Sequence, residues 1–346
     1  MTQRHELVVV EPSPFSRGRL SRRFDRGALV GLGALIATTA AAEPLGSLLP
    51  FIGAPALALL VGMTLRLRYT PAPAARGVLA FASQTVLKCA VVLLGATFGL
   101  AQVAHIGRTS LPLMLGTLVV ALVAAWLVGR ALGVGGNLQT LVGVGTAICG
   151  ASAIGAVSGV IGAAESEIAY AISTIFVFNV VAVVLYPALG HLLSLSQHGF
   201  GLWAGTAIND TSSVVAAAYT YGHTAGNVAV VTKLARTTMI IPIVLGLAAM
   251  HARRPGSAQR PLWRLVPAFL IWFLLASALN TAGLISPSLA SGLARAATLL
   301  ITVALAAIGL STRFSELRRT GLRPLVLGAV LWAVVGVTGL LLQGAL

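Results

Sequence analysis

The chain has 346 residues, of which 57% are hydrophobic and only 9% are charged, and its formal net charge is +15. Soluble domains carry about 25% charged residues, so this composition excludes an ordinary soluble protein and indicates an integral membrane protein. Many of the arginines lie in short loops between apolar stretches, which indicates that they set the orientation of the chain in the membrane rather than bind nucleic acid.

Residues 1–26 form an arginine-rich tail, and we assign residues 27–346 to a single transmembrane domain. The tail contains the pair Arg22-Arg23 and precedes a short apolar core, a pattern that export signals share. Many more apolar stretches follow. This favours an uncleaved first helix with the tail in the cytoplasm.

Eleven apolar stretches predict an all-α, polytopic membrane protein with about eleven transmembrane helices. They cover residues 27–42, 53–67, 77–100, 110–130, 138–163, 167–190, 199–221, 226–250, 265–284, 290–312 and 323–344. Because the second stretch is short, ten helices remain an open alternative. The arginines concentrate in alternate loops, which predicts a cytoplasmic N-terminus and an outward-facing C-terminus, with Glu43, Arg108, Glu165 and Glu167 in outer loops.

Two segments in this domain repeat each other: GTAICGASAIGAV (Gly145–Val157) and GTAINDTSSVVAA (Gly205–Ala217). Their Gly, Ser, Thr, Asn and Asp residues weaken helices or favour caps, so both segments predict interrupted helices. A second pair, Gly95–Gly116 and Gly309–Gly328, is also similar. The pairs favour inverted repeats with broken or crossed helices. The first pair becomes antiparallel only if one segment re-enters the membrane, which the sequence leaves open.

A broken helix at membrane depth survives only beside protein or a water-filled cavity. The half-helix after the break points unpaired N–H groups and a positive dipole end into that cavity, where an anion can bind. For the first copy, small-residue helix packing is an open alternative. The candidate ligand residues are Ser152 in the first copy and Asn209, Asp210, Thr211, Ser212 and Ser213 in the second.

Four charged residues fall well inside the predicted helices: Lys88, Asp210, Lys233 and Arg236. Each is costly there unless it is paired or hydrated. Three cations against one carboxylate favour an anionic ligand, and Asp210 is a candidate proton carrier or ion ligand. Alternatives are that Lys88 and Lys233 reach the headgroup region and that Arg236 pairs with Asp210. No metal-ligand spacing, Walker motif, nucleophile elbow or dinucleotide loop is present, so we expect neither an enzyme nor a cofactor.

The stretches GTAICGASAI, FGLWAGTAINDTSSVVAA and VVTKLARTTMIIPIVL, in this order, resemble the YeiH-like sulfate exporter family of UPF0324-type membrane proteins. The resemblance begins near Leu29 and covers nearly the whole chain. It implies a secondary carrier of the bacterial inner membrane, in the cation–proton antiporter and anion-transporter group, with a fold similar to the NhaA antiporter and the bile-acid symporters. Carried over by position, its site residues are Cys149, Gly150, Ser152, Asp210, Lys233 and Arg236.

The family pattern has His-Asp followed by Ala-Gln where this chain has Asn209-Asp210 followed by Ser212-Ser213. The expected site therefore lacks a titratable His and a Gln.

The sequence thus predicts a secondary active transporter of a small anion, sulfate or organosulfonate-like, that works by alternating access. Ser152, Asn209, Thr211 and Ser212 would hold the anion, Lys233 or Arg236 would balance its charge, and Asp210 would carry a coupling H⁺ or Na⁺. The alternative is a cation or cation–proton antiporter with Asp210 as the ion ligand. Expected partners are the small anion and the lipid bilayer, not nucleic acid, and a homodimer is an open alternative.

Overall fold

The computed structural model describes residues 26–48, 54–68, 70–251, 267–311 and 322–345, and every regular element in these ranges is a helix. The helices are α1 (Arg26–Leu48), α2 (Ala54–Arg68), α3 (Pro73–Phe81), the π-helix η1 (Ala82–Val86), α4 (Leu87–Gly95), α5 (Leu100–Ala131), α6 (Gly136–Ala147), α7 (Ala151–Ile161), α8 (Glu165–Leu192), α9 (Gln197–Ala207), α10 (Thr211–Tyr221), α11 (His223–Thr237), α12 (Ile240–His251), α13 (Ala268–Thr281), α14 (Pro287–Ser311) and α15 (Leu322–Ala345). The predicted tail, apart from Arg26, and part of the repeat segment Gly309–Gly328 lie outside the described residues.

Six helical segments of the described chain are long and apolar enough to cross a membrane. They are Pro73–Gly95, Leu100–Ala131, Glu165–Leu192, His223–Met250, Pro287–Ser311 and Leu322–Ala345. Each of the eleven predicted stretches contains helix, but two of them, 138–163 and 199–221, differ in kind from the expected spanning helices. Each of these two is a pair of short helices that folds back on itself.

The first pair, α6 and α7, forms a helical hairpin that we call hairpin 1, joined by the turn Ile148–Gly150 (tip 1). Asn137 at the start of α6 donates from Nδ2 to the carbonyl oxygen of Gly162 after α7, over 3.4 Å. The two ends of the hairpin therefore lie together. Gly150 has φ +66° and ψ −128°, a conformation that a side chain would strain, which explains a glycine at the tip.

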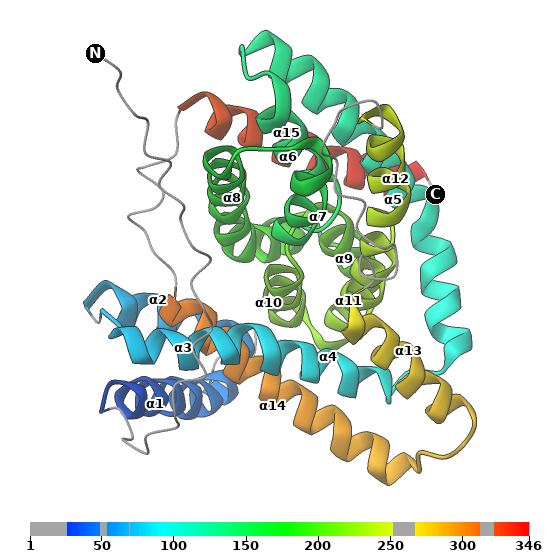
Figure 1. Ribbon diagram of the computed structural model, residues 1–346. Coiled ribbons are helices and arrows are strands. Elements are labelled where there is room, and N and C mark those ends of the chain that lie inside the picture. The colour runs from blue at the N-terminus through cyan, green and yellow to red at the C-terminus, as the bar shows by residue number, and fades with distance from the viewer. Residues whose placement is uncertain (1–25, 49–53, 69, 252–266, 312–321, 346) are drawn as a thin grey trace.

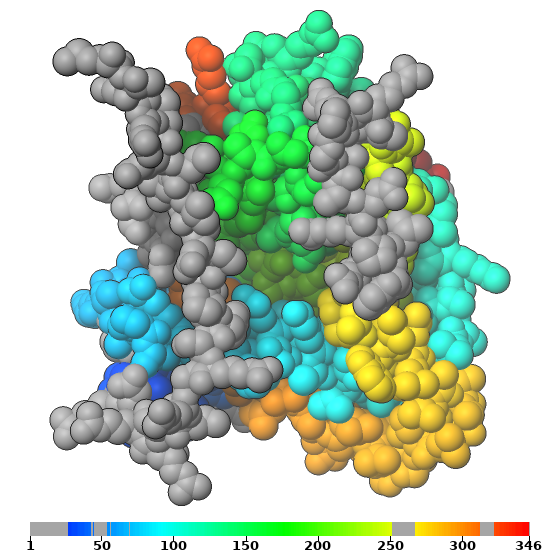
Figure 2. All heavy atoms as spheres, in the orientation of Figure 1, coloured from blue at the N-terminus to red at the C-terminus, as the bar shows by residue number. Residues whose placement is uncertain are grey.

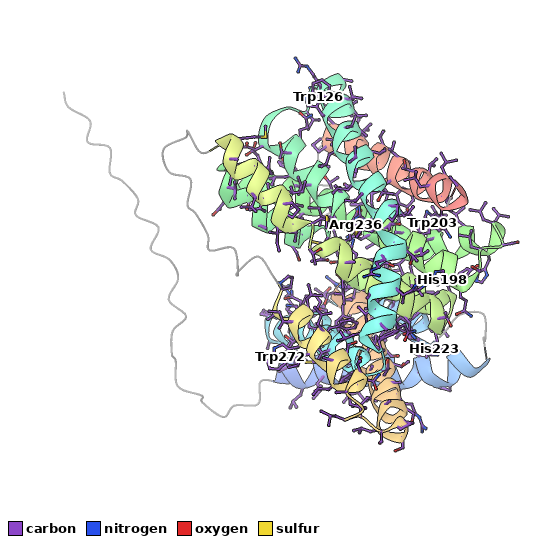
Figure 3. The ribbon with its side chains drawn as sticks, turned by 90° about the vertical axis from the view of Figure 1, so that its right-hand side faces the viewer. Trp126, His198, Trp203, His223, Arg236 and Trp272 are labelled. Atoms are coloured by element: carbon purple, nitrogen blue, oxygen red, sulfur yellow. The ribbon has the colours of Figure 1, made fainter. Side chains whose placement is uncertain are left out.

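The second pair, α9 and α10, forms hairpin 2, joined by the turn Ile208–Asp210 (tip 2). Gln197 at the start of α9 accepts at Oε1 from the backbone N–H of Thr224, just beyond α10, over 3.0 Å. His198 near the start of α9 and His223, the first residue of α11, lie on the same side of the molecule (Figure 3). Hairpin 2 thus also begins and ends at one place.

The helices form two layers (Figure 1). The lower layer contains α1 to α4 with α13 and α14, so it brings the first helices of the described chain together with two helices that precede α15, as the blue, cyan, yellow and orange atoms show in the space-filling view (Figure 2). The upper bundle contains α5 to α12 with α15, and the largest buried cluster lies within it. A second cluster packs α2, α4, α13 and α14 against α10 and α11, which holds the layers together.

Candidate functional site

The two tips meet at one side chain of α11. Lys233 is completely buried, and its Nζ donates to the carbonyl oxygen of Ile148 in tip 1 over 2.7 Å and to that of Ile208 in tip 2 over 2.9 Å. One ammonium group therefore ties together two hairpins whose tips are sixty residues apart in the sequence.

Arg236, one turn further along α11, is also completely buried and lies in the interior of the molecule (Figure 3). Its Nε donates to the carbonyl of Ala147 over 2.7 Å, and its Nη2 to that of Thr146 over 2.9 Å. Its Nη1 donates to the carbonyl of Thr206. The last carbonyls of a helix lack intrahelical partners and carry its negative dipole end. The two cations of α11 therefore satisfy and neutralise the carboxyl ends of α6 and α9.

A cavity of about 690 Å³ lies between the tips and the lower layer. The upper bundle contributes the first residues of α7 and α10 to its wall, and the lower layer contributes η1 and α4. The polar or charged side chains that line it are Ser83, Gln84, Lys88, Cys149, Ser152, Asn179, Asp210, Thr211, Ser212, Ser213, Thr237 and Ser311. The amino ends of α7 and α10, which carry partial positive charge, therefore face this cavity.

Asp210 is the N-cap residue of α10. Its Oδ2 accepts from the backbone N–H of Ser212 over 2.9 Å and also from the Ser212 hydroxyl. Its own backbone N–H donates to Oδ1 of Asn179 on α8 over 3.2 Å. In the described part of the chain no ion pair joins Asp210 to Arg236, so the pairing considered from the sequence is not formed. The carboxylate instead serves as an internal anion at a helix amino end.

The structure thus brings Cys149, Ser152, Asp210, Thr211 and Ser212 to one cavity wall. Three of the other predicted residues take different places, since Asn209, Lys233 and Arg236 are buried behind that wall.

Asn209 is only 1% exposed, and neither of its side-chain polar atoms has a hydrogen-bond partner among the described residues. That Asn209, Lys233 or Arg236 contacts a substrate stays a prediction. Sequence reasoning missed Ser83 and Gln84, which line the opposite wall on the π-helix. π-Helices recur at functional sites, but composition gives no signal for one. The one available sign was a short polar run before Lys88 in an apolar stretch.

Comparison with known sequences places the chain in a family. Residues 28–328 match the family model described as Conserved hypothetical protein 698. A UPF0324 membrane protein of Streptococcus pyogenes serotype M6 is 41% identical over 310 residues, which cover 86% of this chain and 91% of that protein. One of Streptococcus mutans is 40% identical over 312 residues (86% and 92%), and one of Clostridium tetani is 36% identical over 316 residues (86% and 92%). The chain therefore belongs to the Conserved hypothetical protein 698 family, and its relatives are membrane proteins.

Proposed function

We propose that this protein is a secondary active transporter that carries a small oxyanion, sulfate or organosulfonate-like, across the bacterial inner membrane. The observation that carries the proposal is that the carboxyl ends and the amino ends of the hairpin helices have different surroundings at the tips. Lys233 and Arg236 occupy the carbonyl ends of α6 and α9, so these carbonyls are not free to bind a cation. The amino ends of α7 and α10 open into the cavity, where they favour an anion.

The order of elements supports an inverted repeat, the arrangement typical of secondary carriers. The 28 residues of α8 lie between the hairpins and are long and apolar enough to cross the membrane. If α8 crosses, the hairpins enter from opposite sides and the two GTAI segments run antiparallel. With a cytoplasmic N-terminus, Glu165 and Glu167 then lie on the same side as Arg130 rather than in the outer loop expected from eleven spans. When two re-entrant hairpins replace two spanning helices, the number of crossings falls by two, so the C-terminus stays outside.

The two layers provide the parts for alternating access. The upper bundle contributes Ser152, Thr211 and Ser212 to bind the anion, and the lower layer contributes Gln84 and Lys88 to the opposite wall. In our proposal the layers shift relative to each other while the Lys233 and Arg236 bonds keep the two tips together. Asp210 carries the coupling ion, H⁺ or Na⁺, in the same cavity.

One feature favours the alternative of a cation antiporter. Asp210, Asn179 and Ser212 place carboxylate, amide and hydroxyl oxygens at one point of the cavity wall, and hard cations prefer such oxygens. In that case Asp210 would hold the transported ion, and external anions would have no effect on flux.

Flux measurements in liposomes distinguish the anion transporter from the cation antiporter. We expect saturable uptake of radiolabelled sulfate or methanesulfonate that depends on an imposed H⁺ or Na⁺ gradient and loses this dependence in Asp210→Asn. Glu165→Gln is the matched control, because it neutralises an exposed carboxylate outside the cavity. Cation flux that is indifferent to every anion and abolished by Asp210→Asn would overturn the anion proposal in favour of the antiporter.

A further inference from the structure

The second helices of the two hairpins, α7 and α10, differ in what covers them. Each has 11 residues, and the gap-free alignment of the GTAI segments pairs the two helices residue by residue. In this register Gly155 of α7 corresponds to Val215 of α10, and Gly159 corresponds to Tyr219. A difference in burial between these equivalent positions therefore shows how each hairpin packs against the rest of the protein.

On α10, the face toward the lower layer is covered. Val215 is completely buried and Tyr219 is 5% exposed, and both belong to the buried cluster that includes Leu59 of α2 and Ile301 of α14. The helix α10 packs against α2 and α14. Tyr219 is also held by the upper bundle, because its hydroxyl donates to Oδ1 of Asn227 on α11 over 2.8 Å. Hairpin 2 is therefore closed against the lower layer along α10.

On α7, the equivalent face is uncovered. Ala151, Ser152, Gly155 and Gly159 are exposed, and with about 100° of rotation per residue they lie on one face of the helix. A Cβ built on Gly155 would have no heavy atom within 4 Å. The helices that pack extensively against α7 are α6, α8 and α12, which all belong to the upper bundle. Because Ala151 and Ser152 also line the cavity, hairpin 1 stands apart from the lower layer along α7.

The cavity extends to the side from which hairpin 1 enters. Its wall includes Ala268 at the start of α13 and Ser311 at the end of α14, and both residues are exposed. If α8, the α11–α12 segment, α13 and α14 each cross the membrane, these two helix ends lie on the same side as Asn137 and Gly162, the ends of hairpin 1. With the cytoplasmic N-terminus proposed above, this is the cytoplasmic side.

We infer that α7 and α10 are the two gates of the transporter, which close on the lower layer in turn, and that the structure is the conformation open to the cytoplasm. In the opposite conformation the face of α7 with Ala151, Gly155 and Gly159 packs against the lower layer. Val215 and Tyr219 of α10 then separate from it and open the cavity to the outside. Small residues suit the face of α7 because they let helices approach closely. The inference rests on the proposed function and identifies its gates.

The bonds of Lys233 explain why one gate opens as the other closes. They hold the two tips together, and α7 and α10 extend from the tips toward opposite sides of the membrane if the hairpins enter from opposite sides. A tilt of the upper bundle about the tips therefore moves one of these helices toward the lower layer and the other away from it.

The first test places a bulky side chain on the open gate. Gly155→Leu has room in this conformation but would prevent α7 from closing, so we expect sulfate uptake into liposomes to fall about tenfold or more, because overpacking a closed contact is costly. Sulfate binding by calorimetry and the melting temperature should stay unchanged. Gly246→Leu is the matched control, since Gly246 is an exposed helical glycine with equal room and lies outside the cavity. Wild-type uptake by Gly155→Leu would overturn the gates and leave anion transport standing.

The second test needs no substrate. Gly155→Cys and Val215→Cys, each in a background where serine replaces both native cysteines, are treated with an anionic methanethiosulfonate in permeabilised membranes. We expect Gly155→Cys to react about tenfold faster or more, because the buried position 215 reacts only when the closed contact opens. Equal rates, or a faster reaction at position 215, would overturn the assignment of the open and closed gates. A wild type that transports none of sulfate, methanesulfonate and chloride would overturn the proposed function, and the two reaction rates would still decide which hairpin is open.

Discussion

Replacement of Lys233 by Met tests whether this side chain holds the two tips together. Met has a similar length but no donor, so the carbonyls of Ile148 and Ile208, both completely buried, lose the ammonium that now bonds them. Arg236 remains, but its donors already bond other carbonyls, which belong to residues one or two positions before Ile148 and Ile208. The variant therefore leaves two orphaned acceptors at the negative ends of α6 and α9.

The magnitude follows from these two contacts. A buried acceptor left unsatisfied costs about 1–3 kcal/mol, so the pair costs about 2–6 kcal/mol. Loss of a buried ammonium also removes its desolvation penalty, which offsets part of this cost. We expect a net loss of about 3 kcal/mol, which is large against the roughly 5–15 kcal/mol that stabilises a typical folded protein.

The measurement is the melting temperature of the purified protein in detergent. With about 2 °C per kcal/mol for a chain of this size, Lys233→Met should melt about 6 °C lower than the wild type. Lys88→Met is the matched control, because Lys88 is exposed and lines the cavity. It should change stability by less than about 0.5 kcal/mol and weaken anion binding instead. Equal melting temperatures for the two variants would refute the tie between the tips, and a stable Lys233→Met protein without anion binding would make Lys233 a substrate contact.

Three further predictions concern the site, the packing and the topology. Asp210→Asn keeps an oxygen that can cap α10, so the variant should stay within about 1 kcal/mol of wild-type stability in thermal melts. Its anion uptake should no longer respond to an H⁺ or Na⁺ gradient, and unchanged coupling would contradict the role of the carboxylate. Gly205→Ala places a Cβ 2.8 Å from Cβ of Thr232, on α11, and should cost about 1–3 kcal/mol in thermal unfolding. Gly246→Ala, with no heavy atom within 4 Å of the new Cβ, should stabilise by up to about 1 kcal/mol. The topology of hairpin 1 is tested in cells with two single-cysteine variants, Gly135→Cys and Ala164→Cys, in a background where serine replaces both native cysteines. A membrane-impermeant maleimide should reach the two positions from the same side if hairpin 1 re-enters, and from opposite sides if it spans.

The positions of the helices could be predicted from the sequence because apolar runs and the Gly, Asp and Ser residues between them are local signals. The hairpins could not. A 26-residue apolar segment with a central break has the same composition whether it crosses the membrane or turns back. The contacts that decide between these folds, Asn137 with Gly162 and Gln197 with Thr224, join residues about 25 positions apart and leave no periodic signature.

The charged residues of the site were visible in the sequence, but their roles depend on geometry. A count of the charges in the sequence treats Lys233 and Arg236 as positive charges that are available to a ligand. In the structure both bond backbone carbonyls, so the dipole ends of α6 and α9 offset about half of their charge, and neither side chain lines the cavity. The donors that line it lie at the opposite ends of the hairpins, at Ser152 and Ser212, and a count of charges in the sequence does not include them.

The asymmetry of the tips also sets the charge that the cavity can accept. Two helix amino ends contribute about +0.5 each and the carboxyl ends of α6 and α9 about −0.5 each, Asp210 contributes −1, and Lys88, Lys233 and Arg236 contribute +1 each, so the empty site carries about two positive charges. Sulfate brings this sum to zero, whereas a monoanionic sulfonate leaves one positive charge in a site of low dielectric. We therefore expect a proton or Na⁺ on Asp210 to raise the affinity for sulfate more than that for methanesulfonate, because the dianion gains twice the attraction. Titration calorimetry at two Na⁺ concentrations and two pH values measures this difference. If the affinities for both anions depend equally on the cation, Asp210 does not interact electrostatically with the bound anion.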